Sequence, residues 1–290
     1  MTSRWRVLSA RTVVPWRVSL AVGALILGSF GAAVGTAGAA GAATTATHPG
    51  TTHTRPGGSV GGYQPGGLIK AHKSGATPDA AQGVKNDSST STNWSGYVVT
   101  GGTGAFNSVS SSWTEPAASC GSGTQYAAFW VGLDGYNSDS VEQTGTDSDC
   151  SNGSPDYYGW YEMYPADPVY FTNPVSPGDS MSASVAVSGT SYTLTLTDST
   201  QGWTQTENET GSYSNSSAEV ITEAPSSSTG PLPLADFGTV NYSAASANGT
   251  SMSSQNPTSI TMVGSSGDQL DSTSAIDGSG DFSNTWDASS

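Results

Sequence analysis

The sequence predicts an all-β domain, an antiparallel β-sandwich of two sheets, over residues 86–290. Two positive observations favour it: short runs with alternation or with β-branched and aromatic residues recur along this region, and clusters of Gly, Pro, Asn and Ser separate them. A third is negative, since no segment keeps a 3.6-residue apolar period over a useful length. Many short strands joined by such turns are typical of sandwiches.

The first 43 residues have the three-part pattern of a secretory signal. A positive start leads into an uncharged stretch whose most apolar part is LAVGALIL, and the small-residue run TAGAAGAA follows. We expect cleavage between about Ala39 and Ala43. A membrane anchor is the alternative, but the second half of the uncharged stretch is too weakly apolar to favour a span of about 20 residues. The sequence therefore predicts a secreted, extracellular protein without stable membrane association after cleavage.

Residues 44–85 form a basic, low-complexity segment rich in Gly, Pro, Thr and Ala. Such a composition cannot bury enough apolar surface to offset chain entropy. A plain linker is one interpretation. A propeptide is favoured, because the segment is basic and is joined to an acidic domain, and opposite charges attract strongly at low salt.

Residues 86–290 have a length that suits one domain with a substantial core. Runs such as SYTLTLTD and YYGWYEMYP carry the strand signals, and turns such as VSPGDS and ANGTS lie between runs. In chain order we expect strands at 93–100, 106–115, 124–133, 157–165, 180–187, 191–198, 218–223, 238–244 and 258–264.

The two cysteines, Cys120 and Cys150, are expected to form one disulfide in a secreted chain. Closing the loop between them would stabilise the fold by about 3 to 4 kcal/mol on the chain-entropy estimate. Two cysteines without a histidine in this region do not make a usual zinc site. A carboxylate calcium site is the alternative, but no D-x-[DN]-x-[DN]-G loop with a glutamate at its end occurs. We therefore expect neither a metal nor another cofactor.

Charge divides the chain near residue 85. No Lys, Arg or His follows that position, whereas all 23 acidic residues except Asp79 do, which leaves 22 carboxylates and a formal charge of −22. A Ser-His-Asp triad, a Cys-His pair and a Ser-Lys dyad are thereby excluded from residues 86–290. Three classes remain: a carboxyl-dependent peptidase, a glycosidase that uses two carboxylic acids, and a non-catalytic binding module.

The acidic charge favours work at low pH, because Asp and Glu titrate near about 3.9 and 4.3 and their mutual repulsion disappears in acid. An acidic surface kept for solubility is the alternative. In either case a surface of this sign repels phosphate, so a nucleic-acid partner is not expected. Nothing in the sequence demands more than a monomer.

Seven segments, in this order, resemble the glutamic peptidase family called eqolisins (peptidase family G1). They are NWSG (93–96), FWVGLDG (129–135), VEQTGTD (141–147), YGWYEMYP (158–165), SPGDS (176–180), SAEVI (217–221) and ADFG (235–238). The resemblance implies a concanavalin A-like, jelly-roll type sandwich and a secreted acid endopeptidase acting on proteins or peptides, with its own propeptide as an intramolecular inhibitor.

The resemblance also implies a catalytic dyad of Gln143, in QTG, and Glu219, in AEV. Amide hydrolysis needs a base for the attacking water and an acid for the leaving nitrogen, and Glu219 could serve as both. The neutral amide of Gln143 could orient the water and donate to the oxyanion, where a carboxylate would repel it.

Four further residues are candidates for substrate binding. Trp94 and Trp130 match aromatic residues that line the family's cleft, although each could equally be a core residue. Asp134 and Glu162 could tune the site as partly buried carboxyls, or act as structural hydrogen-bond partners. A sandwich glycosidase and a carbohydrate-binding module remain the alternative functions.

Overall fold

The computed structural model describes residues 51–52 and 88–290. The described residues all belong to one compact unit. The expected signal peptide and most of the basic segment lie outside the described residues. Within the described residues, no helix is long and apolar enough to cross a membrane.

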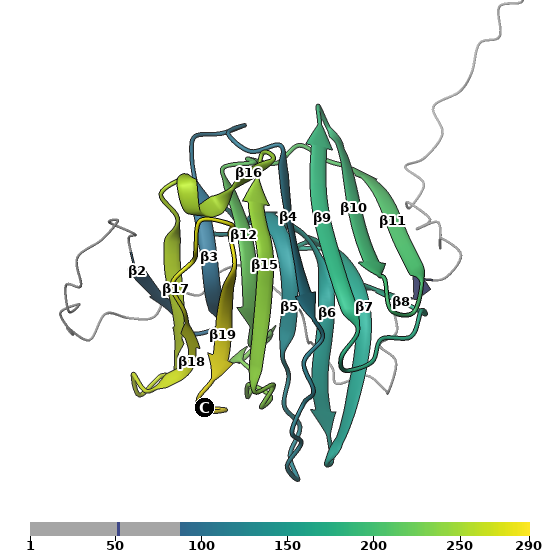
Figure 1. Cartoon of the computed structure of the whole chain (residues 1–290), viewed down its shortest axis with the longest axis vertical. Coiled ribbons are helices and arrows are strands. Elements are labelled where there is room, and N and C mark those ends of the chain that lie inside the picture. The colour runs from purple at the N-terminus through teal and green to yellow at the C-terminus, as the bar shows by residue number, and fades with distance from the viewer. Residues whose placement is uncertain (1–50, 53–87) are drawn as a thin grey trace, which may run out of the picture. The chain divides into compact units, whose positions relative to one another are not determined.

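Two sheets form two layers, and they are joined at one side where β17 pairs with β18 (Figure 1). Neighbouring strands run antiparallel in each sheet apart from the parallel pair β17 and β2. The first sheet has the order β1 (Thr51–Thr52), β8 (Val169–Phe171), β7 (Ser154–Tyr164), β6 (Val141–Ser151), β5 (Ala128–Asp134), β12 (Ser217–Glu223), β3 (Trp94–Thr100), β17 (Thr258–Val263), β2 (Ser88–Ser91). The second has the order β11 (Trp203–Thr210), β10 (Ser191–Asp198), β9 (Ser180–Ser188), β4 (Ser108–Thr114), β15 (Thr239–Ala247), β19 (Phe282–Trp286), β18 (Gln269–Thr273).

The remaining elements are short and lie outside the two layers' main strands. They are β13 (Ser226–Ser227), β14 (Gly230–Pro231), β16 (Thr250–Ser251) and the 3₁₀ helix η1 (Met252–Ser254). The all-β prediction is therefore confirmed, and the two layers agree with the predicted sandwich.

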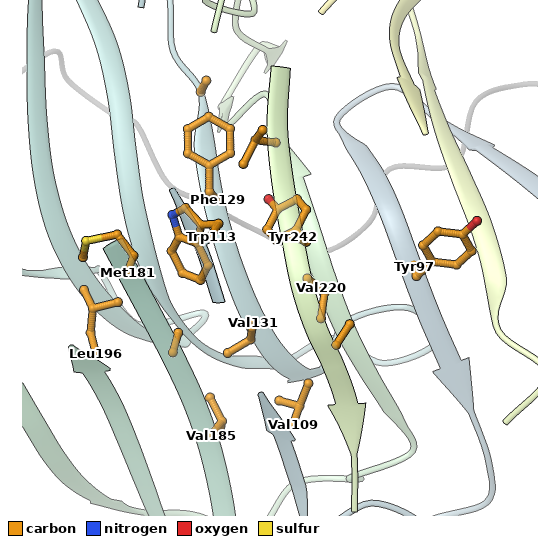
Figure 2. Packing of buried hydrophobic residues seen from close by; sticks show 14 of the residues in the cluster. Tyr97, Val109, Trp113, Phe129, Val131, Met181, Val185, Leu196, Val220 and Tyr242 are labelled. Atoms are coloured by element: carbon orange, nitrogen blue, oxygen red, sulfur yellow. The ribbon is translucent and has the colours of Figure 1, made fainter. Parts of the chain in front are cut away.

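The main core lies between the two layers. Figure 2 shows Val131 and Val220 of the first sheet near Val109 and Val185 of the second. Because side chains alternate between the faces of a strand, every second residue of each inner strand enters this core. The pattern of β10, SYTLTLTD, is the simplest case, with Tyr192, Leu194 and Leu196 buried in turn.

A second apolar cluster lies on the opposite face of the first sheet. Its residues occupy the strand positions that alternate with those of the main core. They are Trp94, Val98, Ala128, Trp130, Val141, Tyr158, Trp160, Tyr170, Ile221 and Ile260. We call this face, away from the second sheet, the outer face. Its residues are buried although the inter-sheet core is on the other side. Strands β3, β5, β6 and β12 are thus covered on both faces.

The expected disulfide between Cys120 and Cys150 is present, with 5.4 Å between the Cα atoms. It ties the segment before β5 to the far end of β6. The bond therefore fixes one end of the pair of strands that carries the VEQTGTD and FWVGLDG motifs.

All nine predicted strands are present, and four longer strands were missed: β6, β11, β18 and β19. Strand β6 was missed because its sequence, VEQTGTDSDCS, is polar apart from Val141, Gly145 and Cys150, yet ten of its eleven residues are buried. Strand β11 has an exposed polar face, and its sequence WTQTENET offers few apolar residues to mark the other one. When the polar side chains of a strand are paired with residues far away in the sequence, the strand shows no clear apolar pattern.

Gly145 makes the close pairing of β5 and β6 possible. A Cβ atom there would lie 2.1 Å from the backbone oxygen of Phe129 and 2.8 Å from the Cα of Trp130. We therefore expect Gly145→Ala to lower the free energy of unfolding by about 3 kcal/mol or more, because backbone atoms cannot move aside without separating the strands. Urea unfolding of the purified variant measures this loss. Gly121→Ala is the control and should change stability by less than about 0.5 kcal/mol, since nothing lies within 4 Å of its Cβ position. Equal stability of the two variants would contradict this account of the β5–β6 contact.

Candidate functional site

Five residues on neighbouring strands form one row across the outer face of the first sheet. In register order they are Val98, Glu219, Gly132, Gln143 and Glu162, from β3, β12, β5, β6 and β7. The two residues of the expected dyad are therefore two strands apart and face the same side. Since neighbouring strands lie about 4.8 Å apart, their Cα atoms are about 10 Å apart.

Gly132 lies between the two dyad residues and has no side chain on this face of β5. A Cβ atom at this position would come within 2.9 Å of the Trp130 ring and 3.2 Å of the Gln143 Cβ. A side chain here would therefore collide with the Trp130 ring and with β6 beside Gln143. The row thus provides a carboxyl and an amide that face each other across a position without a side chain.

Glu219 is fully buried, and neither of its carboxyl oxygens has a hydrogen-bond partner among the described residues. Burial raises its pKa well above the ordinary value for glutamate. The nearby Ser217 hydroxyl offsets part of this effect without forming a well-aligned hydrogen bond, and the charges of Asp134 and Glu142 raise the pKa further. A buried acid without partners is costly for the fold, which is typical of groups that await a ligand.

Gln143 is also fully buried and bonds to the next residue of the row. Its Nε2 donates to the Oε2 of Glu162 over 2.6 Å. Its own Oε1, like the Oε1 of Glu162, has no hydrogen-bond partner in the described part of the chain. Burial raises the pKa of Glu162 well above its usual range, and the hydrogen bond from Gln143 opposes that rise.

Trp94 and Trp130 form an aromatic wall on the outer face next to the row. Their rings meet edge to face with centroids 4.9 Å apart. The indole Nε1 of Trp130 donates to the Oε2 of Glu223 over 2.9 Å, which fixes the ring. Both tryptophans are fully buried and belong to the outer-face cluster, so they lie on the dyad's side of the sheet. Their contact with a substrate stays a prediction.

Asp134 ends β5 and holds the segment that leads into β12. Its carboxylate accepts hydrogen bonds from the backbone N–H of Asn215 at 2.5 Å and of Ser216 at 2.9 Å, and from the Ser216 hydroxyl at 3.0 Å. It is fully buried, as is Glu162, although both were expected to be partly exposed. These contacts position the strand that carries Glu219, while a direct contact of Asp134 with substrate stays a prediction.

Sequence reasoning did not single out Gly132 or Glu223. Gly132 lies within the FWVGLDG motif, and its place opposite both dyad residues depends on strand register, which a single sequence does not show. Glu223 ends β12 and accepts hydrogen bonds from Trp130 and from the Nδ2 of Asn93 at 3.3 Å. The alternation from Glu219 through Ile221 to Glu223 is the signal that places it on the same face.

A further buried carboxyl lies beneath β6, on the core side. Glu115 accepts hydrogen bonds from Thr146 at 2.5 Å, Ser148 at 2.7 Å and the indole of Trp113 at 3.2 Å. Burial raises its pKa to about 8, and these donors oppose the rise. The pKa of Glu142 is also about 8, because of burial and then the charge of Asp134.

Comparison with known proteins gives one family and several relatives. A family model described as the peptidase A4 family matches residues 92–286. Aspergillopepsin-2 of Aspergillus niger is 32% identical over 183 residues, which are 54% of this chain and 64% of that protein. The matched part of the chain thus spans 64% of the length of that curated relative.

Two solved structures are also similar. The first is the crystal structure of scytalidoglutamic peptidase with a peptide-based transition-state analogue, with a TM-score of 0.58 and 28% identity over 67% of this chain and 98% of that chain. The second is SCP-B, a member of the eqolisin family of peptidases, in a complex with the tripeptide Ala-Ile-His. It has a TM-score of 0.56 and 27% identity over 67% of this chain and 98% of that chain.

The buried carboxyls predict a stability that falls as the pH rises. For Glu115 and Glu142 the folded pKa is about 8 against an ordinary value of 4.5, so folding favours their protonated forms. Their stabilising contribution is complete below pH 4.5 and is lost as the pH rises towards 8, by up to about 1.4 kcal/mol per pH unit for each group.

We therefore expect the thermal midpoint to fall between about pH 4.5 and 8, with a shallower fall in a Glu115→Gln variant that has lost one titrating group. Circular dichroism melts in a Glu219→Gln background measure this without self-digestion. A midpoint that increases over the same range would contradict it.

Proposed function

This chain belongs to the peptidase A4 family, and from that premise we propose that it is a secreted endopeptidase that hydrolyses peptide bonds at acid pH. The observation that carries the proposal is the row on the outer face, in which Glu219 and Gln143 lie on either side of Gly132, a residue without a side chain. The unpartnered carboxyl oxygens of Glu219 leave it able to bind a water or a substrate atom.

Glu219 is the general base and then the general acid of the proposed reaction. As a carboxylate it takes a proton from the water that attacks the peptide carbonyl carbon, and it later gives that proton to the departing nitrogen. The C–N bond breaks as the nitrogen is protonated, so protons balance over one turnover. Within residues 88–290 no Lys, Arg or His competes for this role.

Gln143 is the neutral partner of Glu219. Its amide oxygen can accept a hydrogen bond from the attacking water, and an N–H of the same amide can donate to the oxygen that becomes negative. A donor of this kind contributes about 2.7 to 4 kcal/mol to transition-state stabilisation in other hydrolases. An amide keeps this character at any pH, whereas a second carboxyl would have to stay protonated.

A peptide substrate is supported by the relatives and by the shape of the face. One similar structure contains a peptide-based transition-state analogue and another contains the tripeptide Ala-Ile-His. In this chain the rings of Trp94 and Trp130 lie on the same face as the row, and once uncovered they would offer apolar surface to an extended peptide. The glycosidase alternative has less support, because the residue opposite Glu219 is an amide and not a second acid.

Activity depends on the protonation state of Glu219, which in turn depends on whether the outer face is buried. Burial holds its pKa well above the ordinary value, and a protonated carboxyl cannot take a proton from water. Exposure of the face to solvent would remove the main cause of that shift. We infer that the proposed enzyme becomes active when its outer face is uncovered.

The basic segment before the domain is the proposed cover and intramolecular inhibitor. Strand β1 pairs with β8 at one edge of the first sheet, and β2 pairs with β17 at the other. Residues 53–87 connect these edges, and at about 3.3 Å per residue they are long enough to cross a sheet about 40 Å wide. Their cations, Arg55, Lys70, Lys73 and Lys85, complement the acidic domain, and acid would weaken the attraction by protonating carboxylates.

We expect Gln143→Ala and Glu219→Gln each to abolish peptide hydrolysis while the β-rich fold is retained. The first change removes the oxyanion donor and the second removes the base. Release of new peptide termini from denatured casein across pH 2 to 7 measures activity, and circular dichroism checks the fold. Activity of the wild type near pH 3 to 4 with normal activity in either variant would refute the dyad. Reducing sugar from a β-glucan in place of peptides would support a glycosidase.

We also expect the Glu219→Gln precursor to stay unprocessed at pH 3 to 4, while the wild-type precursor converts itself by cleavage near Lys85. The reason is that cleavage in cis needs the same base as cleavage of substrate. Gel mobility and N-terminal sequencing over time measure conversion. Addition of a trace of mature wild type to the variant precursor is the control that its cleavage site is accessible. If the variant precursor matures alone, self-cleavage is wrong.

A further inference from the structure

The amide of Gln143 has two orientations of nearly the same shape but different chemistry. In the first orientation the amide nitrogen points towards β7 and the amide oxygen points away from β7. In the second orientation the nitrogen and the oxygen exchange places. Only the first leaves an acceptor for the attacking water on the side of Glu219. The proposed reaction therefore depends on which amide atom lies on the side of Glu219.

The neighbours of Gln143 leave one group to select the orientation. Along β6, the residues on the same face are Val141 and Gly145, and neither has a polar side chain. Across to β5, Gly132 has no side chain. Across to β7, the carboxyl of Glu162 accepts the Nε2 hydrogen bond over 2.6 Å.

We propose that Glu162 is a positioning residue that holds the amide nitrogen of Gln143 towards β7 and so turns the amide oxygen towards the attacking water. This inference rests on the proposed peptidase function and goes beyond it, since it assigns the reactive geometry of Gln143 to a residue on a different strand. Glu162 acts through Gln143 and transfers no proton itself.

The surroundings of Glu162 make the contact effective. The side chain is fully buried in this structure, and its Oε2 accepts the hydrogen bond from Gln143. On the same face of β7, Trp160 precedes it by two residues, and the Trp160 indole is fixed by a hydrogen bond to Asp147 at 2.8 Å. Burial raises the pKa of Glu162, so the carboxyl carries a proton at pH 3 to 4. We place that proton on Oε1, which has no hydrogen-bond partner among the described residues. Oε2 then accepts from Gln143, and the reversed amide would bring two oxygens into contact.

The assignment explains how one amide can serve two roles. One N–H of Nε2 is committed to Glu162, and the other is left for the developing oxyanion. The unpartnered Oε1 is left for the water that Glu219 deprotonates. The chain Glu162, Gln143, water and Glu219 is then a single line of hydrogen bonds along the row.

Two substitutions at Glu162 separate positioning from the other roles. Glu162→Leu removes the acceptor at nearly constant size, and we expect kcat to fall about 100-fold with KM changed by less than about threefold, because the amide loses its direction. Glu162→Gln retains an acceptor but also offers a donor that can pair with the reversed amide. We expect kcat to fall about two- to tenfold, because only part of the population has the correct orientation.

Each chain is expressed at full length and converted at acid pH before measurement. We then measure kcat and KM on a peptide substrate and the inhibition constant of a peptide-based transition-state analogue. The analogue's affinity should fall by about the same factor as kcat/KM in each variant, whereas a packing defect alone would leave it unchanged per folded molecule. Glu115→Gln is the control: it alters another fully buried glutamate, on the core side of β6, and kcat should stay within twofold of wild type.

Each outcome bears on the assignment. If Glu162→Leu retains wild-type kcat, the positioning role is wrong. It is also wrong if Glu162→Gln is as inactive as Glu219→Gln, because Glu162 would then itself transfer a proton. If Glu162→Leu does not fold, Glu162→Gln decides alone: a two- to tenfold loss supports the role, and wild-type or absent activity overturns it. A wild type without peptidase activity refutes the proposed function, which is a separate result from a failure of this series.

Discussion

Carboxyl groups in this domain must be buried without a cation to balance them, and the structure depends on neutral donors that take the cation's place. Residues 88–290 contain no Lys, Arg or His. Indole, hydroxyl and backbone N–H groups donate hydrogen bonds to the buried carboxyls instead. Trp160 donates to Asp147, Thr146 donates to Glu115, and the backbone N–H of Ser216 donates to Asp134. Neutral donors keep their hydrogens at every pH, so these contacts survive acid and add no charge to the interior. The cost appears at higher pH, where buried acids lose protons that the fold favours.

The same constraint shapes the candidate site. A hydrolase that lacks cations in its domain cannot stabilise an oxyanion with Lys or Arg, so an amide or a backbone N–H must do it. Gln143 can fill that role, but an amide is useful only when its direction is fixed. Strand register places Gly132, which has no side chain, on one side of Gln143 and Glu162 on the other. Gly145, two residues after Gln143 on β6, lets β5 and β6 approach closely, because a Cβ atom there would lie 2.1 Å from the backbone oxygen of Phe129.

Much of the fold could be predicted from the sequence because most strands bury one apolar face. Strands such as β10 and β15 alternate in a way that reads directly from the residues. Strand β6 could not be read this way, because Thr146 and Ser148 enter the core as partners of Glu115 and not as apolar residues. For the site, the motifs predicted Gln143 and Glu219, while the row that joins them follows from register between strands far apart in sequence. That information lies in backbone pairing, and local patterns do not contain it.

The burial of the outer face connects these points to control of the proposed activity. Burial raises the pKa of Glu219 for the same physical reason that it raises that of Glu115: removal from water disfavours the charged form. For Glu115 this is permanent, because the residue follows β4 of the second sheet and bonds to Thr146 and Ser148 of the first, so it cannot be exposed without separating the two sheets. Glu219 lies on the face of the first sheet that is turned away from the second, so under the proposed function its cover could be removed while the two sheets stay packed. Desolvation acts in the same way on both carboxyls, and the face of the sheet that carries each one decides whether the shift in pKa can be relieved without unfolding.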